Sequence, residues 1–470
     1  HVPAMIGYVT DIEGDAVWWR RYVELSEVLH LHPEDGLVRL AEGAHFVFGG
    51  DAVDHKPGSL RVLQDLLDLK RRYPERVHLL LGNRDICKLR LWVELGELHG
   101  EQAPLRSHPG VYWHRASRPC QVLSDADLSA SDSAAAAVRL HWILKHTMGA
   151  SQAFESRRAE LSGSCGEQQV GDDEVVRSFR DSVMPGGAMF EYLRCGKLAV
   201  RLGSTLFLHA GLPRQGSTWR PGWVPGWEDP AAPDREGLPL TLWIEALEDL
   251  RAAALAECEA AHTAGRCVSR AWSTEGGYCH EQPGSALLQY GMRDMPSGER
   301  QPSVIYNGWL SEDLYQPMQP DDATLVWLRE GGVRHVVTGH LPHGDAPLFL
   351  PLAEDIFAVS ADTSFAGSVQ WPSVPLASEA PVVSGEGPTR GQSVCEVLVD
   401  ELSGALRVHG VLSQGVAFEA TSPGDSALGR ETTDGWRVKG RDGDGELLLC
   451  RNVKWDFENR IAHENDVELV

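Results

Sequence analysis

The stretch Val77–Lys88 (VHLLLGNRDICK) constrains the fold most, because a run of apolar residues ends abruptly in Gly-Asn-Arg-Asp. The apolar part predicts a buried strand, Val77–Leu81, and Gly82 permits a turn that a side chain would obstruct. Open α/β sheets bind ligands beyond the carboxyl ends of their strands. Asn83 is therefore a candidate oxygen ligand for a hard cation, and Arg84 is a candidate phosphate-binding residue.

Four other segments have the same form, a short apolar strand that runs directly into polar residues. The strands are predicted at Met5–Thr10, Ala44–Phe48, Thr205–Leu208 and Val333–Thr338. The polar residues that follow them are Asp11 and Glu13, then Asp51, Asp54, His55 and Lys56, then His209, and finally His340 and His343. Helices are expected between the first strands, at Trp18–Leu29 and Ser59–Tyr73. This alternation predicts βαβ units and a largely parallel sheet, so the fold class is α/β.

The overall charge excludes one class of partner. The chain has 43 basic and 67 acidic residues, which give a formal net charge of -24. A nucleic-acid surface needs a basic footprint, so no nucleic-acid partner is expected. An anionic substrate remains compatible with this charge, because a bound metal ion can reverse the local field.

Cysteine usage and hydropathy bear on the compartment. The nine cysteines include no C-x-x-C spacing, and we interpret them as mostly reduced thiols. No run of eighteen apolar residues and no secretory signal are visible, so neither a membrane span nor a membrane partner is expected. The sequence starts at His1 rather than Met, and an original targeting segment could precede it. A cytoplasmic location is the prediction.

The distribution of patterns along the chain predicts its domain organisation. Residues 1–377 are expected to form the core, with insertions at about 101–196 and 214–330. The first insertion reads as helical, with helices at Ser133–Thr147 and Glu174–Val183 and a polar loop at Ser162–Asp173. Residues 378–392 read as a linker. Residues 393–470 are β-rich, with strand-like alternation at Cys395–Val399, Leu406–Val411, Leu447–Lys454 and Asp466–Val470, either as a small separate unit or as strands added to the core sheets.

The five strand ends together resemble the calcineurin-like metallophosphoesterases. That superfamily shows Asp-x-His, Gly-Asp-x-x-Asp, Gly-Asn-His-Asp/Glu, His-x-Gly and a late Gly-His, in this order. The corresponding segments here are Asp11-Ile12-Glu13, Gly50-Asp51-Ala52-Val53-Asp54, Gly82-Asn83-Arg84-Asp85, His209-Ala210-Gly211 and Gly339-His340. The segments GDAVDHKPGSL and GHLPHG are most similar to the branch that contains serine/threonine phosphatases and symmetrical dinucleoside tetraphosphatases.

The resemblance implies a fold, a cofactor and a reaction. The fold would be a two-sheet β-sandwich flanked by helices, with the site at one edge. Two divalent metal ions are expected, with Mn first and Fe, Mg or Zn as alternatives. Asp11 would bind the first ion, Asp51 would bridge both ions, and Asn83, His209 and His340 would bind the second. Two such ions polarise a phosphoryl oxygen and activate a hydroxide for attack on a phosphate ester.

The chain departs from the family pattern at two positions. Glu13 stands where the family has a histidine ligand of the first ion; we expect it to bind metal, with a preference for Mn or Mg over Zn or with weak binding of that ion. Arg84 stands where the family has the histidine that helps to protonate the leaving group. Arginine stays charged and cannot act as an acid, but it can stabilise phosphoryl charge, with Asp54 holding it in place. His55 and His343 are the other candidates for the acid.

Several roles and substrates stay open on the sequence alone. Lys56 and Arg84 are the candidate substrate-binding residues, and His343 could be a metal ligand, an acid or a residue at the rim of the site. The leading function is metal-dependent hydrolysis of phosphate esters, with a phosphorylated protein or small molecule as substrate. One alternative is a nucleotide or dinucleoside polyphosphate hydrolase. Another is a catalytically degenerate scaffold protein that only binds metal or phosphate.

Overall fold

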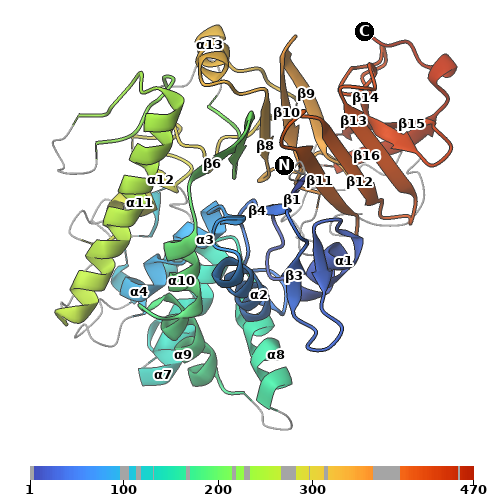
Figure 1. Ribbon diagram of the computed structural model, residues 1–470. Helices are drawn as coiled ribbons and strands as arrows, with labels where there is room; N and C mark the ends of the chain where they lie inside the picture. Colours follow the sequence, from blue (N-terminus) through green and yellow to red (C-terminus); the bar gives the residue numbers. More distant parts are fainter. Residues whose placement is uncertain are drawn as a thin grey trace.

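The computed structural model describes most of the chain (Figure 1). The described residues are 5–95, 105–108, 110–112, 118–130, 132–165, 170–213, 219–226, 233–265, 282–295, 297–311, 316–363, 392–453 and 456–470. Most of the predicted linker, residues 378–391, lies outside these ranges. Within them, no helix combines the length and the apolar character that a membrane span requires.

In the part of the chain that the structure describes, the larger sheet has nine strands and contains both the first and the last of them, β1 and β16. Its first part is parallel: β1 (Met5–Val9) pairs with β4 (His45–Phe48), which pairs with β5 (Val77–Leu79). On the other side of β1 the sheet continues in antiparallel order with six C-terminal strands (Figure 1). These are β11 (Val394–Asp400), β12 (Leu406–Val411), β13 (Ala417–Ser422), β14 (Arg437–Asp442), β15 (Leu447–Val453) and β16 (Asp456–Ala462).

The smaller sheet has five strands in the order β6-β7-β8-β10-β9. They are β6 (Ala199–Leu202), β7 (Thr205–Leu208), β8 (His335–Thr338), β9 (Leu348–Ala353) and β10 (Ile356–Ser360). Strands β7, β8 and β10 are parallel to one another, so their carboxyl ends lie at one edge. The two sheets pack face to face, and the ring of Tyr8 stacks on that of Phe207 with centroids 5.8 Å apart. The predicted two-sheet sandwich is confirmed.

Helices cover the outer face of the parallel strands. On this face the buried side chains of α1 (Ala16–Leu25) and α2 (Ser59–Arg72) pack with Phe46 and Phe48 of β4. Long α11 (Leu240–Thr263) runs along one side of the molecule (Figure 1). The shorter elements are β2 (Leu29–Leu31), β3 (Val38–Leu40), α3 (Asn83–Cys87), α4 (Arg90–Glu94), α10 (Ala188–Cys195), α12 (Ser285–Tyr290) and α13 (Asp322–Glu330).

The first insertion is helical, as predicted, and packs below the sandwich in the view of Figure 1. It contains α5 (Pro119–Val122), α6 (Asp125–Leu128), α7 (Asp132–Trp142) with a π-helical turn at Ile143–Thr147, α8 (Ala153–Cys165) and α9 (Asp172–Val183). Glu160 of α8 accepts the backbone N–H groups of Leu60 and Arg61 at 3.2 and 3.0 Å, which caps the first turn of α2. The insertion is thereby attached to the helix that follows Asp54.

Three local predictions were wrong. The helix expected at Trp18–Leu29 ends at Leu25, where the chain turns into β2. The first residues of the loop expected at Ser162–Asp173 are helical, because α8 continues to Cys165. The strand expected at Asp466–Val470 is replaced by a 3-10 turn at Glu464–Asp466 and a single bridge between Leu469 and Thr432.

Candidate metal centre

The predicted site residues lie where the parallel strands of both sheets end. Five residues other than glycine have a positive φ in the described parts of the chain, and all five are predicted site residues: Asp11, Glu13, Asp51, Asp54 and His340. Such backbone conformations are strained for residues with a side chain, and they persist only where the surrounding structure imposes them. The strain therefore marks this edge as a site whose geometry is tightly defined.

The imidazole of His209 is fixed in one orientation by the backbone. Its Nδ1 lies 2.9 Å from the carbonyl oxygen of Gly49, which can only accept a hydrogen bond. Nδ1 is therefore protonated, which leaves Nε2 as the ring nitrogen that can bind a metal ion. This Nε2 faces two acceptor atoms, Oδ1 of Asn83 at 3.2 Å and Oδ1 of Asp51 at 3.6 Å. Nε2 and these two oxygens could bind one cation together.

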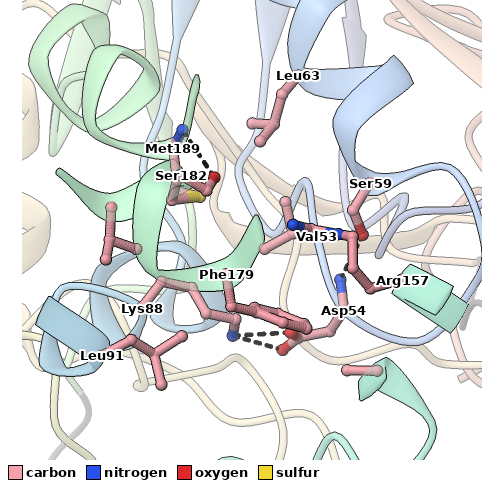
Figure 2. Close-up of a pocket in the computed structure, with 12 residues that line it drawn as sticks. Val53, Asp54, Ser59, Leu63, Lys88, Leu91, Arg157, Phe179, Ser182 and Met189 are labelled. Atoms are coloured by element: carbon pink, nitrogen blue, oxygen red, sulfur yellow. Dashed lines mark hydrogen bonds and ion pairs between the residues drawn. The ribbon is translucent and has the colours of Figure 1, made fainter. Parts of the chain in front are cut away.

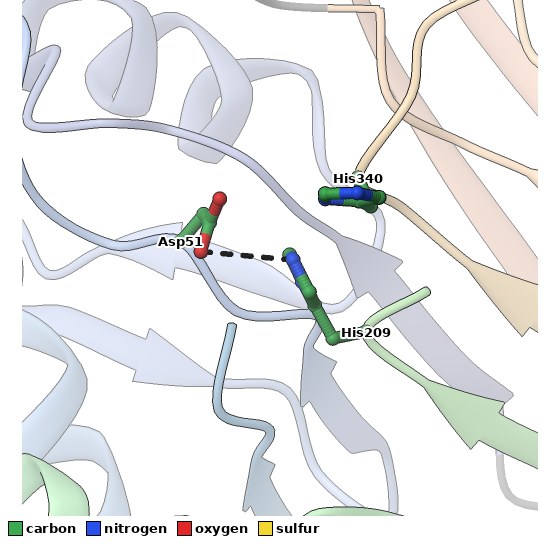
Figure 3. Close-up of side chains that lie close together, drawn as sticks. All are labelled: Asp51, His209 and His340. Carbon is green, nitrogen blue, oxygen red and sulfur yellow. Dashed lines mark ion pairs between the residues drawn. The ribbon is translucent and has the colours of Figure 1, made fainter. Parts of the chain in front are cut away.

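His340 completes the group of converging donors. One ligand atom from each of Asp51, His209 and His340 lies within 4.8 Å of the others (Figure 3). Burial, His209 and Arg84 hold the pKa of His340 well below its usual range, so its ring is neutral. The ring of Tyr306 packs edge-on against it with centroids 5.1 Å apart, and the hydroxyl of Tyr306 accepts the amide of Asn83 at 3.1 Å.

These donors fit a divalent metal ion. One carboxylate, one amide oxygen and two neutral imidazoles are the ligand types that Mn, Fe, Mg or Zn accept in proteins, and no thiolate is among them. The hydrogen bond that His209 donates to a backbone carbonyl is the usual means by which proteins orient an imidazole ligand. We conclude that Asp51, Asn83, His209 and His340 form a candidate metal centre.

Asp85 holds the loops that carry two of these donors. Its carboxylate accepts the backbone N–H groups of Asp51 at 2.8 Å, Ala52 at 2.9 Å and Gly82 at 2.8 Å. Burial and the nearby Asp51 raise the pKa of Asp85 to about 7. A Cβ on Gly82 would lie 2.0 Å from Oδ1 of Asp51, so only glycine fits between the two loops.

A second group of charges lies beside the metal centre and is built around Arg84. Its Nε lies 2.5 Å from Oε1 of Glu13 and 3.6 Å from Oδ2 of Asp51, and its Nη1 lies 3.4 Å from Oδ2 of Asp54. Lys88 adds a second cation, with Nζ 2.7 Å from Oδ1 of Asp54. The predicted contact of Arg84 with Asp54 is thus present, but Glu13 is the nearer partner.

Asp11 lies next to the metal centre. Its Oδ2 accepts the hydroxyl of Thr10 at 2.5 Å and the backbone N–H of His340 at 3.0 Å. Burial and the neighbouring Asp51 raise the pKa of Asp11 well above its usual range. The structure thus brings Asp11 beside the candidate ligands, although it is not part of the closest group of donors.

The remaining predicted site residues divide between the site and its surroundings. Nε2 of His55 is buried 3.6 Å from Oε2 of Glu13. Lys56 is half-buried and donates its backbone N–H to the carbonyl of Glu13 at 3.2 Å. The ring of His343 packs against Phe457 of β16 with centroids 5.1 Å apart, and its carbonyl accepts Nζ of Lys439 in β14 at 2.6 Å. His343 therefore contacts the C-terminal strands.

A small cavity lies between the second charge group and the helical insertion (Figure 2). Its lining includes Asp54 and Lys88 and, from the insertion, Arg157 of α8 and Phe179 of α9. The guanidinium of Arg157 packs over the ring of Phe179, 4.4 Å from its centroid. Trp219 and Trp223 of the second insertion are buried against Trp327 and Tyr290, respectively, and Trp227 lies outside the described residues.

Sequence reasoning assigned no role to three residues that the structure places in the site. Lys88 lies five residues after Asn83, and the apolar run gave no sign that its side chain turns back to Asp54. Tyr306 comes from an irregular segment without a motif. Asp85 was visible as the last residue of Gly-Asn-Arg-Asp, and that motif was the signal that could have revealed its role.

Comparisons with known proteins gave matches only among solved structures. No protein-family model matches the sequence, and no curated protein matches it. A cold-active protein-tyrosine phosphatase of a psychrophilic Shewanella is 14% identical, with a TM-score of 0.40, 89% of this chain and 80% of that chain covered. A mutant of a cold-active protein tyrosine phosphatase is 15% identical, with a TM-score of 0.39 and the same coverage.

A protein serine/threonine phosphatase from Saccharomyces cerevisiae was also found. It is 13% identical, with a TM-score of 0.32, 85% of this chain and 73% of that chain covered. At such identities and TM-scores these likenesses decide nothing about the activity of this chain. The chemistry has to come from the residues of the site.

Proposed function

We propose that this protein is a metal-dependent phosphoesterase whose ion is held by Asp51, Asn83, His209 and His340. The observation that carries the proposal is the orientation of His209, whose Nε2 faces two acceptor oxygens in a buried site. A divalent ion bound there would polarise a phosphoryl oxygen and activate water. The order of the five strand-end motifs supports a phosphate ester as the substrate.

The residues around the metal-binding donors support an anionic substrate group. Arg84 is the most exposed member of the second charge group, with 16% of its side chain accessible against 4% or less for Glu13, Asp51 and Asp54. A phosphoryl group that enters would therefore meet the guanidinium before it meets the carboxylates. Arg84 can orient the phosphoryl oxygens and stabilise their charge, since guanidinium groups bind phosphate through paired hydrogen bonds.

The first ion that the resemblance implies, at Asp11, Glu13 and Asp51, has a less suitable set of donors. Glu13, its expected ligand, is already paired with Arg84. Phosphoprotein, nucleotide polyphosphate and small-molecule substrates are all compatible with the site. Assays on a phosphoserine peptide, a dinucleoside tetraphosphate and a sugar phosphate would distinguish them.

The proposal is tested with Mn²⁺, p-nitrophenyl phosphate and the variant Asp51→Asn. Wild type should hydrolyse the ester with added Mn²⁺ and stop when a chelator is added. Asp51→Asn should lose bound Mn²⁺ and at least about a hundredfold in kcat/KM, because the metal contributes several kcal/mol to the transition state. Asp65→Asn, a buried carboxylate of α2 that pairs with Arg61, is the control and should keep both.

Three outcomes would contradict this function. Metal binding without turnover of any substrate in the panel would favour the scaffold interpretation. Turnover that survives exhaustive chelation, or an Asp51→Asn variant with full activity and unchanged metal content, would remove the metal-dependent mechanism altogether.

A further inference from the structure

The two positions at which the chain departs from the family pattern are in contact with each other. Glu13 and Arg84 are separated by 71 positions, but Nε of Arg84 lies 2.5 Å from Oε1 of Glu13. The side chains are 4% and 16% exposed, so the pair is largely screened from water. Each residue therefore supplies the charge that the other needs in order to be buried.

The guanidinium of Arg84 occupies the space between the carboxylates on this side of the site. Besides Glu13, it approaches Oδ2 of Asp51 at 3.6 Å and Oδ2 of Asp54 at 3.4 Å. These contacts include Glu13 and Asp51, two of the side chains to which the resemblance assigns the first metal ion. A divalent ion in this place would have to displace a cation that keeps its proton at any working pH.

The other candidate ligands are free of this obstruction. Nε2 of His209 faces Oδ1 of Asn83 and Oδ1 of Asp51. The oxygen of Asp51 that approaches the guanidinium is the other one, Oδ2. Oδ1 of Asp51 also accepts the backbone N–H of Arg84 at 2.9 Å, which fixes the direction of the carboxylate. One oxygen of Asp51 thus faces the candidate metal centre, and the other faces the guanidinium.

We propose that Arg84 takes the place of the first metal ion, so that the chain binds a single divalent ion at Asp51, Asn83, His209 and His340. This inference rests on the proposed function, because it assumes that the remaining centre binds metal. Glu13 is then the counter-ion of Arg84 rather than a metal ligand, which replaces our expectation of two ions and of Glu13 as a ligand.

The inference is tested by counting ions rather than by activity. Metal-free protein is dialysed against Mn²⁺, and the bound ion is counted by mass spectrometry and examined by electron paramagnetic resonance. Wild type should bind one Mn²⁺ per chain and give the six-line spectrum of an isolated ion. The double variant Glu13→His/Arg84→His restores the family's residues and should bind a second ion, with the spectrum of an exchange-coupled pair.

Two further variants separate charge from coordination. Arg84→Lys keeps a cation beside Glu13 and should still bind one ion. Glu13→Gln removes the carboxylate but leaves the guanidinium, and it should also bind one ion. Circular dichroism of each variant establishes that it is folded before its ions are counted.

The outcomes also separate this inference from the proposed function. Two tightly bound ions in wild type, or a folded double variant that binds only one, would overturn the inference. No bound ion in wild type would instead overturn the metal centre itself. The wild-type measurement decides the number of ions even if the double variant does not fold.

Discussion

Lys88 and Asp54 form a buried ion pair, with Nζ 2.7 Å from Oδ1 and the two side chains 3% and 1% exposed. Asp54 lies between this ammonium and the guanidinium of Arg84, which is 3.4 Å from its Oδ2. The carboxylate is thus held from two sides. Its position fixes that of Arg84, and through Arg84 it is connected to Glu13 and Asp51.

The first prediction is that Lys88→Met is strongly destabilising. Loss of the ammonium leaves the buried carboxylate of Asp54 with Arg84, whose Nη1 lies 3.4 Å from Oδ2, as its partner. Breaking a buried ion pair costs about 3–5 kcal/mol of unfolding free energy. Adding Asp54→Asn should recover part of this loss, because the uncompensated charge is removed. Urea unfolding followed by circular dichroism measures both effects.

An exposed ion pair provides the control for this prediction. Arg329 and Asp355 lie 2.9 Å apart with side chains 43% and 54% exposed. Arg329→Met should cost far less unfolding free energy than Lys88→Met, since solvent screens exposed pairs. A loss at Lys88 no larger than that at Arg329 would show that the Asp54–Lys88 pair is not a structural support of the site.

The second prediction concerns the choice of leaving group. Arg84 cannot donate a proton, so departure of an alkyl alcohol should be slower than departure of an aryl alcohol, which needs little protonation. Arg84→Ala should slow both p-nitrophenyl phosphate and a phosphoserine peptide by about a hundredfold, because charge stabilisation in the transition state is lost. Arg84→His should raise kcat/KM for the phosphoserine peptide relative to the aryl ester.

The activity of Arg84→Ala can also contradict this prediction. If Arg84→Ala leaves both kcat/KM values within about twofold of wild type, Arg84 does not act on the phosphoryl group. It would then serve only as the counter-ion of Glu13 and Asp54, the contacts that the structure shows.

The third prediction distinguishes the two histidines that remained as candidates for the acid. His55 lies in the site, next to Glu13, whereas His343 packs against Phe457 in the C-terminal strands. His55→Asn should therefore lower kcat/KM for the phosphoserine peptide by about a hundredfold and that for p-nitrophenyl phosphate much less, as expected for loss of a proton donor. His343→Gln should lower the melting temperature and leave the ratio of the two kcat/KM values unchanged. An equal loss on both substrates in His55→Asn would argue for a positioning role.

The sequence made the ends of the parallel strands predictable. Short apolar runs followed by polar residues were sufficient to place Asp51, Asn83, His209 and His340 at one edge, because parallel strands end on the same side of a sheet. The spacing of leucines in α2 likewise indicated its buried face. These signals are local, and each strand or helix carries its own pattern.

Contacts between distant segments could not be read in this way. The pairing of Glu13 with Arg84, and that of Lys88 with Asp54, depends on how the loops after β1, β4 and β5 are folded. The orientation of His343 depends on its contacts with β14 and β16, and the sequence did not predict either of these two strands. The strand predicted at the C-terminus failed because an apolar alternation of four or five residues does not require a partner strand.

The last prediction concerns the C-terminal strands, which the sequence left as either a separate unit or an extension of the core. β11 pairs with β1 along its length, from Met5 with Asp400 to Tyr8 with Val397. Glu396 of β11 is fully buried and accepts the hydroxyl of Tyr22 in α1 at 2.9 Å. Removing residues 393–470 would expose the edge of β1 and part of the core between the sheets, so a chain that ends at residue 392 should not fold cooperatively.

The matched control is a chain that ends at residue 455, which loses β16 at the outer edge of the sheet, the 3-10 turn at Glu464–Asp466 and the bridge between Leu469 and Thr432. This shorter truncation should keep a cooperative thermal transition, at a lower temperature than wild type, because β1 retains β11 as its neighbour. Circular dichroism and analytical ultracentrifugation of both truncated chains test the difference. A soluble, cooperatively folded chain ending at residue 392 would show that residues 1–377 form a core of their own. The pairing of β11 with β1 would then not be required for folding.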